Sequence, residues 1–183
     1  MFILYALLIG LLIGALSGGR VAGLAALHIR WAGVIVFGLF VQIVLFTDAV
    51  AARVGDLGPV IYVASTLLVM AAVARNYAIP GMLVVAAGAA MNLAAILANG
   101  GYMPAGESAM AALGKAEPTI YSNSAVIPEP ALWFLTDIFA MPAGMPFANV
   151  FSPGDVVIGI GIAIVIVVAM RRPVPATATT ATA

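Results

Sequence analysis

Apolar stretches of membrane-span length constrain this chain more than any other feature. Five of them follow one another, over residues 2–19, 32–52, 59–75, 80–98 and 155–170. A helix needs about 20 mostly apolar residues to cross the hydrocarbon core of a bilayer. Only 8% of the residues are charged, whereas roughly 25% is usual in soluble domains. The sequence therefore predicts an all-α membrane protein, with a bundle of about five transmembrane helices in one domain over residues 1–172.

Turn and cap residues mark where the long connection between the fourth and fifth predicted helices begins and ends. Asn99-Gly100-Gly101 is a natural helix-ending turn, because these residues tolerate positive φ. At the other end, Ser152 can be the N-cap, Pro153 the first helical residue and Asp155 the acid of a capping box. Residues 99–154 are thus predicted to form one long loop.

Within this loop, residues 131–140 predict a short amphipathic helix. Leu132, Leu135, Ile138 and Phe139 would share one face, while Asp137 would point elsewhere. The neighbouring Trp133 and Phe134 suit a membrane interface, so this helix is expected to cover the bundle at the membrane surface. The tail over residues 173–183 is low in complexity and predicts disorder on its own.

The basic residues predict an orientation. With five spans, one side collects Arg20, Arg30, Arg75, Arg171 and Arg172, and the other side holds Arg53 and Lys115. The richer side faces the cytoplasm under the positive-inside rule. The N-terminus and the loop 99–154 are then expected outside, and the C-terminus in the cytoplasm.

Three glycines in the first predicted helix form a small-residue face. Gly10, Gly14 and Gly18 are spaced four apart, which lets another helix approach closely. This face fits either docking of a partner subunit or packing within the bundle.

Two amides lie deep in the predicted spans. Gln42 and Asn92 could line a pocket for a substrate or pigment, or could join two helices by hydrogen bonds. No ionisable residue lies at the middle of a predicted span, which argues against a pump, an ion-coupled transporter or a voltage-gated channel.

Few other residues of the chain could take part in catalysis or bind a metal. The loop 99–154 and its exit carry five acids, which could perform acid–base catalysis or bind Ca²⁺, although a solvated acidic surface is the favoured interpretation. They are Glu107, Glu117, Glu129, Asp137 and Asp155. The chain has no cysteine and one histidine, His28, so the sequence predicts no metal site. A net charge of zero argues against nucleic acid as a partner.

Several segments in order resemble a family of small bacterial membrane proteins that is catalogued as a domain of unknown function. The resembling pieces are Met91-Asn92, the NGGxMP motif at Asn99–Pro104, Leu135–Phe139, and Pro146–Asp155 with its NVFSxGD motif. The resemblance covers nearly all of the chain except the tail. It implies a multi-span protein of the bacterial plasma (inner) membrane and carries no known activity.

These observations leave three functions open. The first is a non-catalytic subunit or accessory protein of a larger bacterial membrane complex, docking through its helices and the loop 99–154. The second is a small transporter or channel, and the third is a membrane enzyme that uses loop acids. No cofactor is evident, although a lipid, quinone or pigment could bind, and the expected partners are other membrane protein subunits and lipid. The candidate contact residues are Gly10, Gly14, Gly18, Gln42, Asn92, Asn99, Gly100, Gly101, Trp133, Asp137 and Asn149.

Overall fold

The structure is a computed structural model that describes residues 2–114, 124–125 and 127–172. Lys115, Glu117 and the predicted disordered tail lie outside the described residues. The described chain is mostly helical, with a few two-residue strands. In order, its elements are α1 (Phe2–Leu16), the 3₁₀ helix η1 (Val21–Ala26), α2 (Ala32–Leu45), α3 (Asp48–Val54), α4 (Leu57–Ala74), α5 (Met82–Ala98), β1 (Met103–Pro104), α6 (Glu107–Leu113), β2 (Ser124–Ala125), the 3₁₀ helix η2 (Trp133–Leu135), β3 (Phe139–Ala140), β4 (Val150–Phe151) and α7 (Pro153–Met170).

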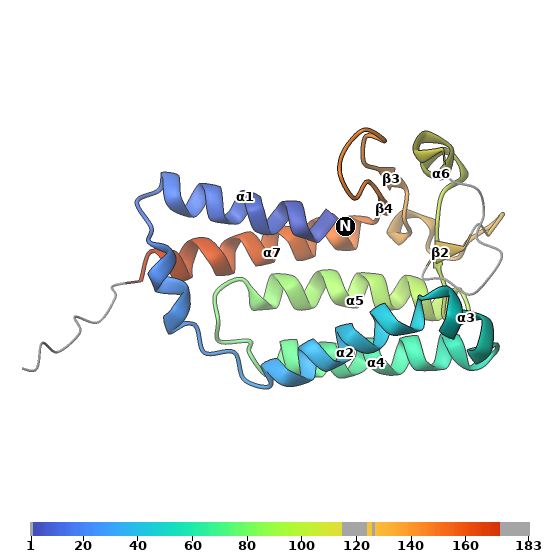
Figure 1. Cartoon of the computed structure of the whole chain (residues 1–183), viewed down its shortest axis with the longest axis horizontal. Coiled ribbons are helices and arrows are strands. Elements are labelled where there is room, and N and C mark those ends of the chain that lie inside the picture. Colours follow the sequence, from blue (N-terminus) through green and yellow to red (C-terminus); the bar gives the residue numbers. More distant parts are fainter. Residues whose placement is uncertain (1, 115–123, 126, 173–183) are drawn as a thin grey trace, which may run out of the picture.

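The long helices pack side by side in the spatial order α1, α7, α5, α4, α2. Figure 1 shows that they run roughly along one direction and that consecutive ones alternate in sense. The short elements between α5 and α7 gather at one end of the helices, while η1 and the turn between α4 and α5 lie at the other. Two short sheets order the first of these ends: β1 pairs in parallel with β2, and β3 pairs antiparallel with β4.

Two helices are long and apolar enough to cross a membrane. They are α4 and α7, each of 18 residues, with mean hydropathies of 2.1 and 2.4. A third span results if α2 and α3 are counted together. The helices α1 and α5 are apolar but shorter. Two or three candidate spans are compatible with a membrane location.

The predicted continuous helix over 32–52 is wrong, because the chain bends by 84° between α2 and α3. At the bend, Thr47 has an extended backbone with φ −75° and ψ 142°. Its hydroxyl donates to the carbonyl of Val44 at 2.7 Å. Threonine thereby satisfies one of the carbonyls that the end of a helix leaves unpaired, and α3 starts in a new direction at Asp48.

The first helix also ends earlier than the predicted residue 19. Gly18 has φ +81°, and its N–H donates to Ala15 O at 3.1 Å while that of Gly19 donates to Gly14 O at 2.9 Å. This pair of bonds is a Schellman motif, which uses a left-handed glycine to close a helix. Gly18 therefore lies in the turn after α1 and not on its face.

The predicted amphipathic helix over 131–140 is wrong as well. Only one 3₁₀ turn, η2, forms there, and Thr136 then has an extended ψ of −179°. The backbone N–H of Asp137 donates to Pro104 O at 2.9 Å, and its carbonyl accepts from Gly106 N at 3.0 Å. Pairing with this distant segment takes the backbone groups that a helix would have used. The helix that does form in this part of the chain, α6, was not predicted.

Both predicted boundaries of the long connection are confirmed. Gly100 and Gly101 have φ +70° and +92° after the end of α5, and Gly101 N donates to Ile96 O at 2.9 Å. At α7, Ser152 Oγ accepts from Asp155 N at 3.0 Å, and Asp155 Oδ2 accepts from Ser152 N at 3.2 Å. This reciprocal pair is the capping box that the sequence predicts.

Candidate functional site

A groove of 530 Å³ lies between α1 and α2, with α5 behind it; we call it the polar-ended groove. Five helices line it, together with the chain that leads into α7. The lining residues are Phe2, Ile3, Leu4, Leu7, Leu39, Gln42, Tyr62, Thr66, Val69, Met70, Ala89, Asn92, Ile96, Asn149, Val150, Asp155 and Ile158. Its polar members come from four separate parts of the sequence, so only the folded chain brings them together.

Asn92 links α5 to the cap of α7 in this groove. Its amide nitrogen Nδ2 donates to Asp155 Oδ1 at 2.8 Å, and its oxygen Oδ1 accepts from Ser152 Oγ at 2.7 Å. Ser152 is fully buried, and such groups are costly in an apolar interior unless they are paired. The capping box and Asn92 therefore form one satisfied network that fixes α5 against the start of α7.

The network requires α5 and α7 to pack closely against each other. A Cβ atom on Gly154 would overlap the Asn92 side-chain oxygen, and one on Gly88 would lie 2.5 Å from Gly154 O and 2.7 Å from Ile158 N. Glycine at both positions lets the backbones of α5 and α7 approach closely. The polar end of the groove thus depends on two residues that carry no side chain.

Gln42 joins α2 to α4 on the opposite wall. Its Nε2 donates to Ser65 Oγ at 3.3 Å and to Thr66 Oγ1 at 3.2 Å. Asn149 enters from the chain before α7 and is half-buried. Its backbone carbonyl accepts from Met141 N at 3.0 Å, while its side chain makes no hydrogen bond to the described residues.

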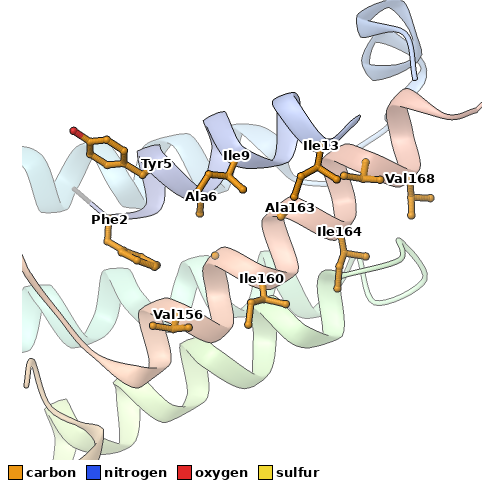
Figure 2. A pocket seen from close by; sticks show the side chains of 12 residues that line it. Phe2, Tyr5, Ala6, Ile9, Ile13, Val156, Ile160, Ala163, Ile164 and Val168 are labelled. Atoms are coloured by element: carbon orange, nitrogen blue, oxygen red, sulfur yellow. The ribbon is translucent and has the colours of Figure 1, made fainter. Parts of the chain in front are cut away.

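The other wall of α1 carries a second groove of 610 Å³, which we call the apolar groove. Figure 2 shows its side chains, which come from facing surfaces of α1 and α7. The residues that line it are Phe2, Tyr5, Ala6, Ile9, Ile13, Val156, Gly159, Ile160, Ala163, Ile164, Val167 and Val168. Tyr5 contributes the one side-chain hydroxyl, and it already donates to Pro146 O at 2.7 Å.

A family model matches residues 26–167 and carries the description "family of unknown function (DUF5317)". The chain belongs to the DUF5317 family. This confirms the resemblance to a family of unknown function. No curated protein and no solved structure matches the chain. The matched region contains α2 to α6 and nearly all of α7, whereas α1 precedes it.

Three of the residues singled out from the DUF5317 sequence meet in the polar-ended groove: Gln42, Asn92 and Asn149. Gln42 and Asn92 join helices by hydrogen bonds, and both also line this groove. Asp155, which the sequence identified as a cap, lines the same groove.

The predicted glycine face is used within the chain. A Cβ on Gly10 would lie 2.9 Å from Ala163 Cα, and one on Gly14 would lie 2.5 Å from Met170 Sδ. Both glycines are buried against α7. They therefore serve packing within the bundle, whereas Gly18 has no atom within 4 Å of the position of a Cβ.

The other predicted contact residues lie outside both grooves. Asn99 holds the connection to α5, because its side chain donates to Ala131 O and accepts from Ala131 N, both at 2.9 Å. Gly101 lies against Pro59, while Gly100 has open space beside it. Trp133 is 63% exposed, and Asp137 is 5% exposed, buried among the short elements rather than in a groove.

The sequence did not indicate which apolar residues line the polar-ended groove, or that Gly88 and Gly154 shape it. One signal was present: Gly88 lies one helical turn before Asn92, and Gly154 precedes Asp155. Small residues beside buried polar groups mark close helix contacts in membranes. Which helix would meet which could not be deduced from this spacing.

Proposed function

We propose that the protein is an integral membrane protein that binds a lipid-like amphiphile between α1 and α2. The observation that carries the proposal is the polar-ended groove. Small-molecule sites are typically concave, of roughly 300–1,000 Å³, mostly apolar, and equipped with a few convergent polar groups. The groove meets each condition, with a volume of 530 Å³ and amides from Gln42, Asn92 and Asn149.

The position of the polar groups supports an amphiphile rather than a fully polar ligand. Asn92 lies in the C-terminal half of α5 and donates to Asp155 in the first turn of α7, so the two polar groups lie together. Apolar side chains, among them Leu7, Leu39 and Met70, line the rest of the groove. A headgroup at the polar end would leave an alkyl chain against these residues.

We further propose five spans, formed by α1, α2, α4, α5 and α7. The alternating direction of the helices supports this (Figure 1). Under this topology, Arg20, Arg30, Arg75 and Arg171 share one end, which would face the cytoplasm of a bacterial plasma membrane. The segment between α5 and α7 and the N-terminus would then lie outside.

Single cysteines test the orientation cleanly, because the natural chain contains none. Ala143→Cys, in the exposed part of the α5–α7 segment, should react with a membrane-impermeant maleimide in intact cells. Arg172→Cys should react only after the cells are permeabilised. The reverse pattern would contradict the proposed orientation.

The binding itself is tested on protein purified in mild detergent. Mass spectrometry of extracted lipid should detect a bound amphiphile at a stoichiometry near one. A Leu7→Trp variant, which places a large ring in the groove, should purify without it. Equal lipid content in the two proteins would contradict the proposal.

A second candidate function is an accessory subunit of a larger membrane complex. An exposed aromatic pair on the α5–α7 segment favours it: Trp133 and Phe134 are 63% and 51% exposed, with ring centroids 6.2 Å apart in an edge-to-face arrangement. Asn99 anchors the chain beside them through Ala131. A stoichiometric heterologous partner that is lost from Trp133→Ala would support this role, and migration of the wild type alone would contradict it.

A further inference from the structure

We infer that the polar-ended groove selects an amphiphile whose headgroup is uncharged and carries a hydroxyl group. This inference rests on the proposed binding function and names the class of ligand. It follows from the charges in the groove and from which hydrogen-bonding groups the fold leaves available.

The charge of the groove argues against an anionic headgroup. Among the described residues that line it, none is Lys, Arg or His, and Asp155 is the one carboxylate. An anion placed there would lack a counter-ion and would face a like charge where water is scarce, which strengthens the repulsion. The start of α7 does not offset this, since Ser152 Oγ already accepts from Asp155 N and the carboxylate already complements the helix dipole.

The same carboxylate offers little to a cationic headgroup. Its Oδ1 accepts from Asn92 Nδ2 at 2.8 Å, and its Oδ2 accepts from Ser152 N at 3.2 Å. Both oxygens are thus engaged in the network that caps α7. These two donors already offset part of the carboxylate charge, which reduces the attraction that Asp155 offers to a cation.

The orientation of the Gln42 amide follows from its neighbours. The hydroxyls of Ser65 and Thr66 both donate to the carbonyl of Tyr62 at 2.8 Å. Each hydroxyl has a single proton, so toward Gln42 both can only accept. Gln42 must therefore turn its NH₂ group to them, which leaves its carbonyl oxygen Oε1 without a donor among the described residues.

The Gln42 oxygen is an unused acceptor that lines a largely apolar groove, so a ligand that donates a hydrogen bond matches it best. A hydroxyl group supplies one, whereas an ester or ketone alone does not. The side chain of Asn149, which also makes no hydrogen bond to the described residues, can donate and accept in addition. Gln42 and Asn149 thus form a pair of contacts that matches an alcohol or polyol headgroup.

The test compares four amphiphiles that share one oleyl-type chain and differ in the headgroup: mono-oleoylglycerol, methyl oleate, oleate and oleylamine. Their dissociation constants are measured with the full-length protein in detergent at a pH where oleate is ionised. We expect mono-oleoylglycerol to bind about fivefold more tightly than methyl oleate, which is the effect of one net hydrogen bond. We expect oleate to bind about tenfold more weakly or worse, from an uncompensated charge.

Two variants test which side chains cause the preference for mono-oleoylglycerol. Gln42→Leu should lose the roughly fivefold advantage of mono-oleoylglycerol over methyl oleate, because the acceptor is gone. Asn149→Ala tests the other contact and disturbs no internal side-chain bond. Thr47→Val, at the exposed bend after α2, is the control and should keep the wild-type ratio.

The outcomes separate this inference from the function on which it rests. If none of the four amphiphiles binds, the proposed binding function fails. If oleate or oleylamine binds as tightly as mono-oleoylglycerol, or if methyl oleate does, the amphiphile site stands and the selection of an uncharged hydroxyl is wrong. An unchanged ratio in both Gln42→Leu and Asn149→Ala would also overturn it.

Discussion

The two grooves that flank α1 have similar volumes, 530 and 610 Å³, and opposite chemistry. Phe2 lines both of them. The polar-ended groove is lined by amides, hydroxyls and a carboxylate as well as apolar side chains. The apolar groove in Figure 2 is lined by residues of α1 and α7, and its one side-chain hydroxyl is already bonded. The two grooves therefore differ in chemistry and hardly in volume.

The chemistry of the two grooves differs because α7 packs differently against α5 and against α1. Toward α5, Gly154 allows close contact and Asn92 closes a polar network over the helix start. Toward α1, small residues such as Gly159 allow contact, and the atoms nearest to a Cβ there belong to the side chains of Ala6 and Phe2. One side of α7 thus combines close packing with polar bonds, and the other relies on packing alone.

The largest effect is expected from Gly154→Ala, which would disrupt the polar network between α5 and α7. The added Cβ overlaps Asn92, and overpacking costs typically 1–3 kcal/mol, so we expect a loss of about 2 kcal/mol in the free energy of unfolding. Unfolding in detergent, followed by tryptophan fluorescence, measures it. Gly144→Ala is the matched control, because no atom lies within 4 Å of its Cβ position, and it should change stability by less than about 0.5 kcal/mol. Equal effects of the two substitutions would refute the close contact.

Placing a large side chain in each groove in turn tests which of the two binds the amphiphile. Leu7→Trp enters the polar-ended groove, and Ile9→Trp enters the apolar one. We expect Leu7→Trp to weaken binding of the amphiphile at least tenfold, or about 1.4 kcal/mol. Ile9→Trp should leave binding unchanged. Equilibrium binding decides between them, and a larger loss in Ile9→Trp would reverse the assignment of the grooves.

A smaller loss is expected from Ser152→Ala. The variant lacks the N-cap bond to Asp155 N and the bond to Asn92 Oδ1. Removal of a helix N-cap costs typically about 1 kcal/mol of stability. The unfolding assay described for Gly154→Ala measures it, and no change in stability would mean that the network does not hold α5 to α7.

The smallest effect is expected on the apolar side. Tyr5→Phe removes the hydrogen bond to Pro146 O, which lies at an exposed position. We expect a decrease in unfolding free energy of no more than about 0.5 kcal/mol, since water can replace such a bond. A loss as large as that of Ser152→Ala would show that this groove also depends on a polar contact.

Two local signals were read correctly from the sequence. The cap at Ser152–Asp155 and the glycine turn after Asn99 depend on neighbouring residues alone, and both are confirmed. The half-buried amides Gln42 and Asn92 were recognised because polar groups are rare in such apolar stretches. Their partners could not be predicted, since Ser65 and Asp155 reach them only through the packing of whole helices.

Non-local pairing explains one of the errors, and local turn residues within apolar stretches explain the other two. Residues 131–140 have a helical apolar pattern, yet Asp137 pairs through its backbone with the segment around Pro104. The bend at Thr47 and the early end of α1 at Gly18 are local features that apolar composition concealed. Composition predicts that a stretch is buried in an apolar medium, but it does not show where the helix within it stops.

The central claim, that the polar-ended groove and not its neighbour binds the amphiphile, is tested most directly by photo-crosslinking. Mono-oleoylglycerol with a diazirine in its chain is bound to the wild-type protein, irradiated, and the adducts are mapped by peptide mass spectrometry. We predict adducts on residues such as Leu7, Leu39 and Met70, which line the polar-ended groove. Adducts concentrated on Ile9, Ile13 and Ile164, in the apolar groove, would contradict it.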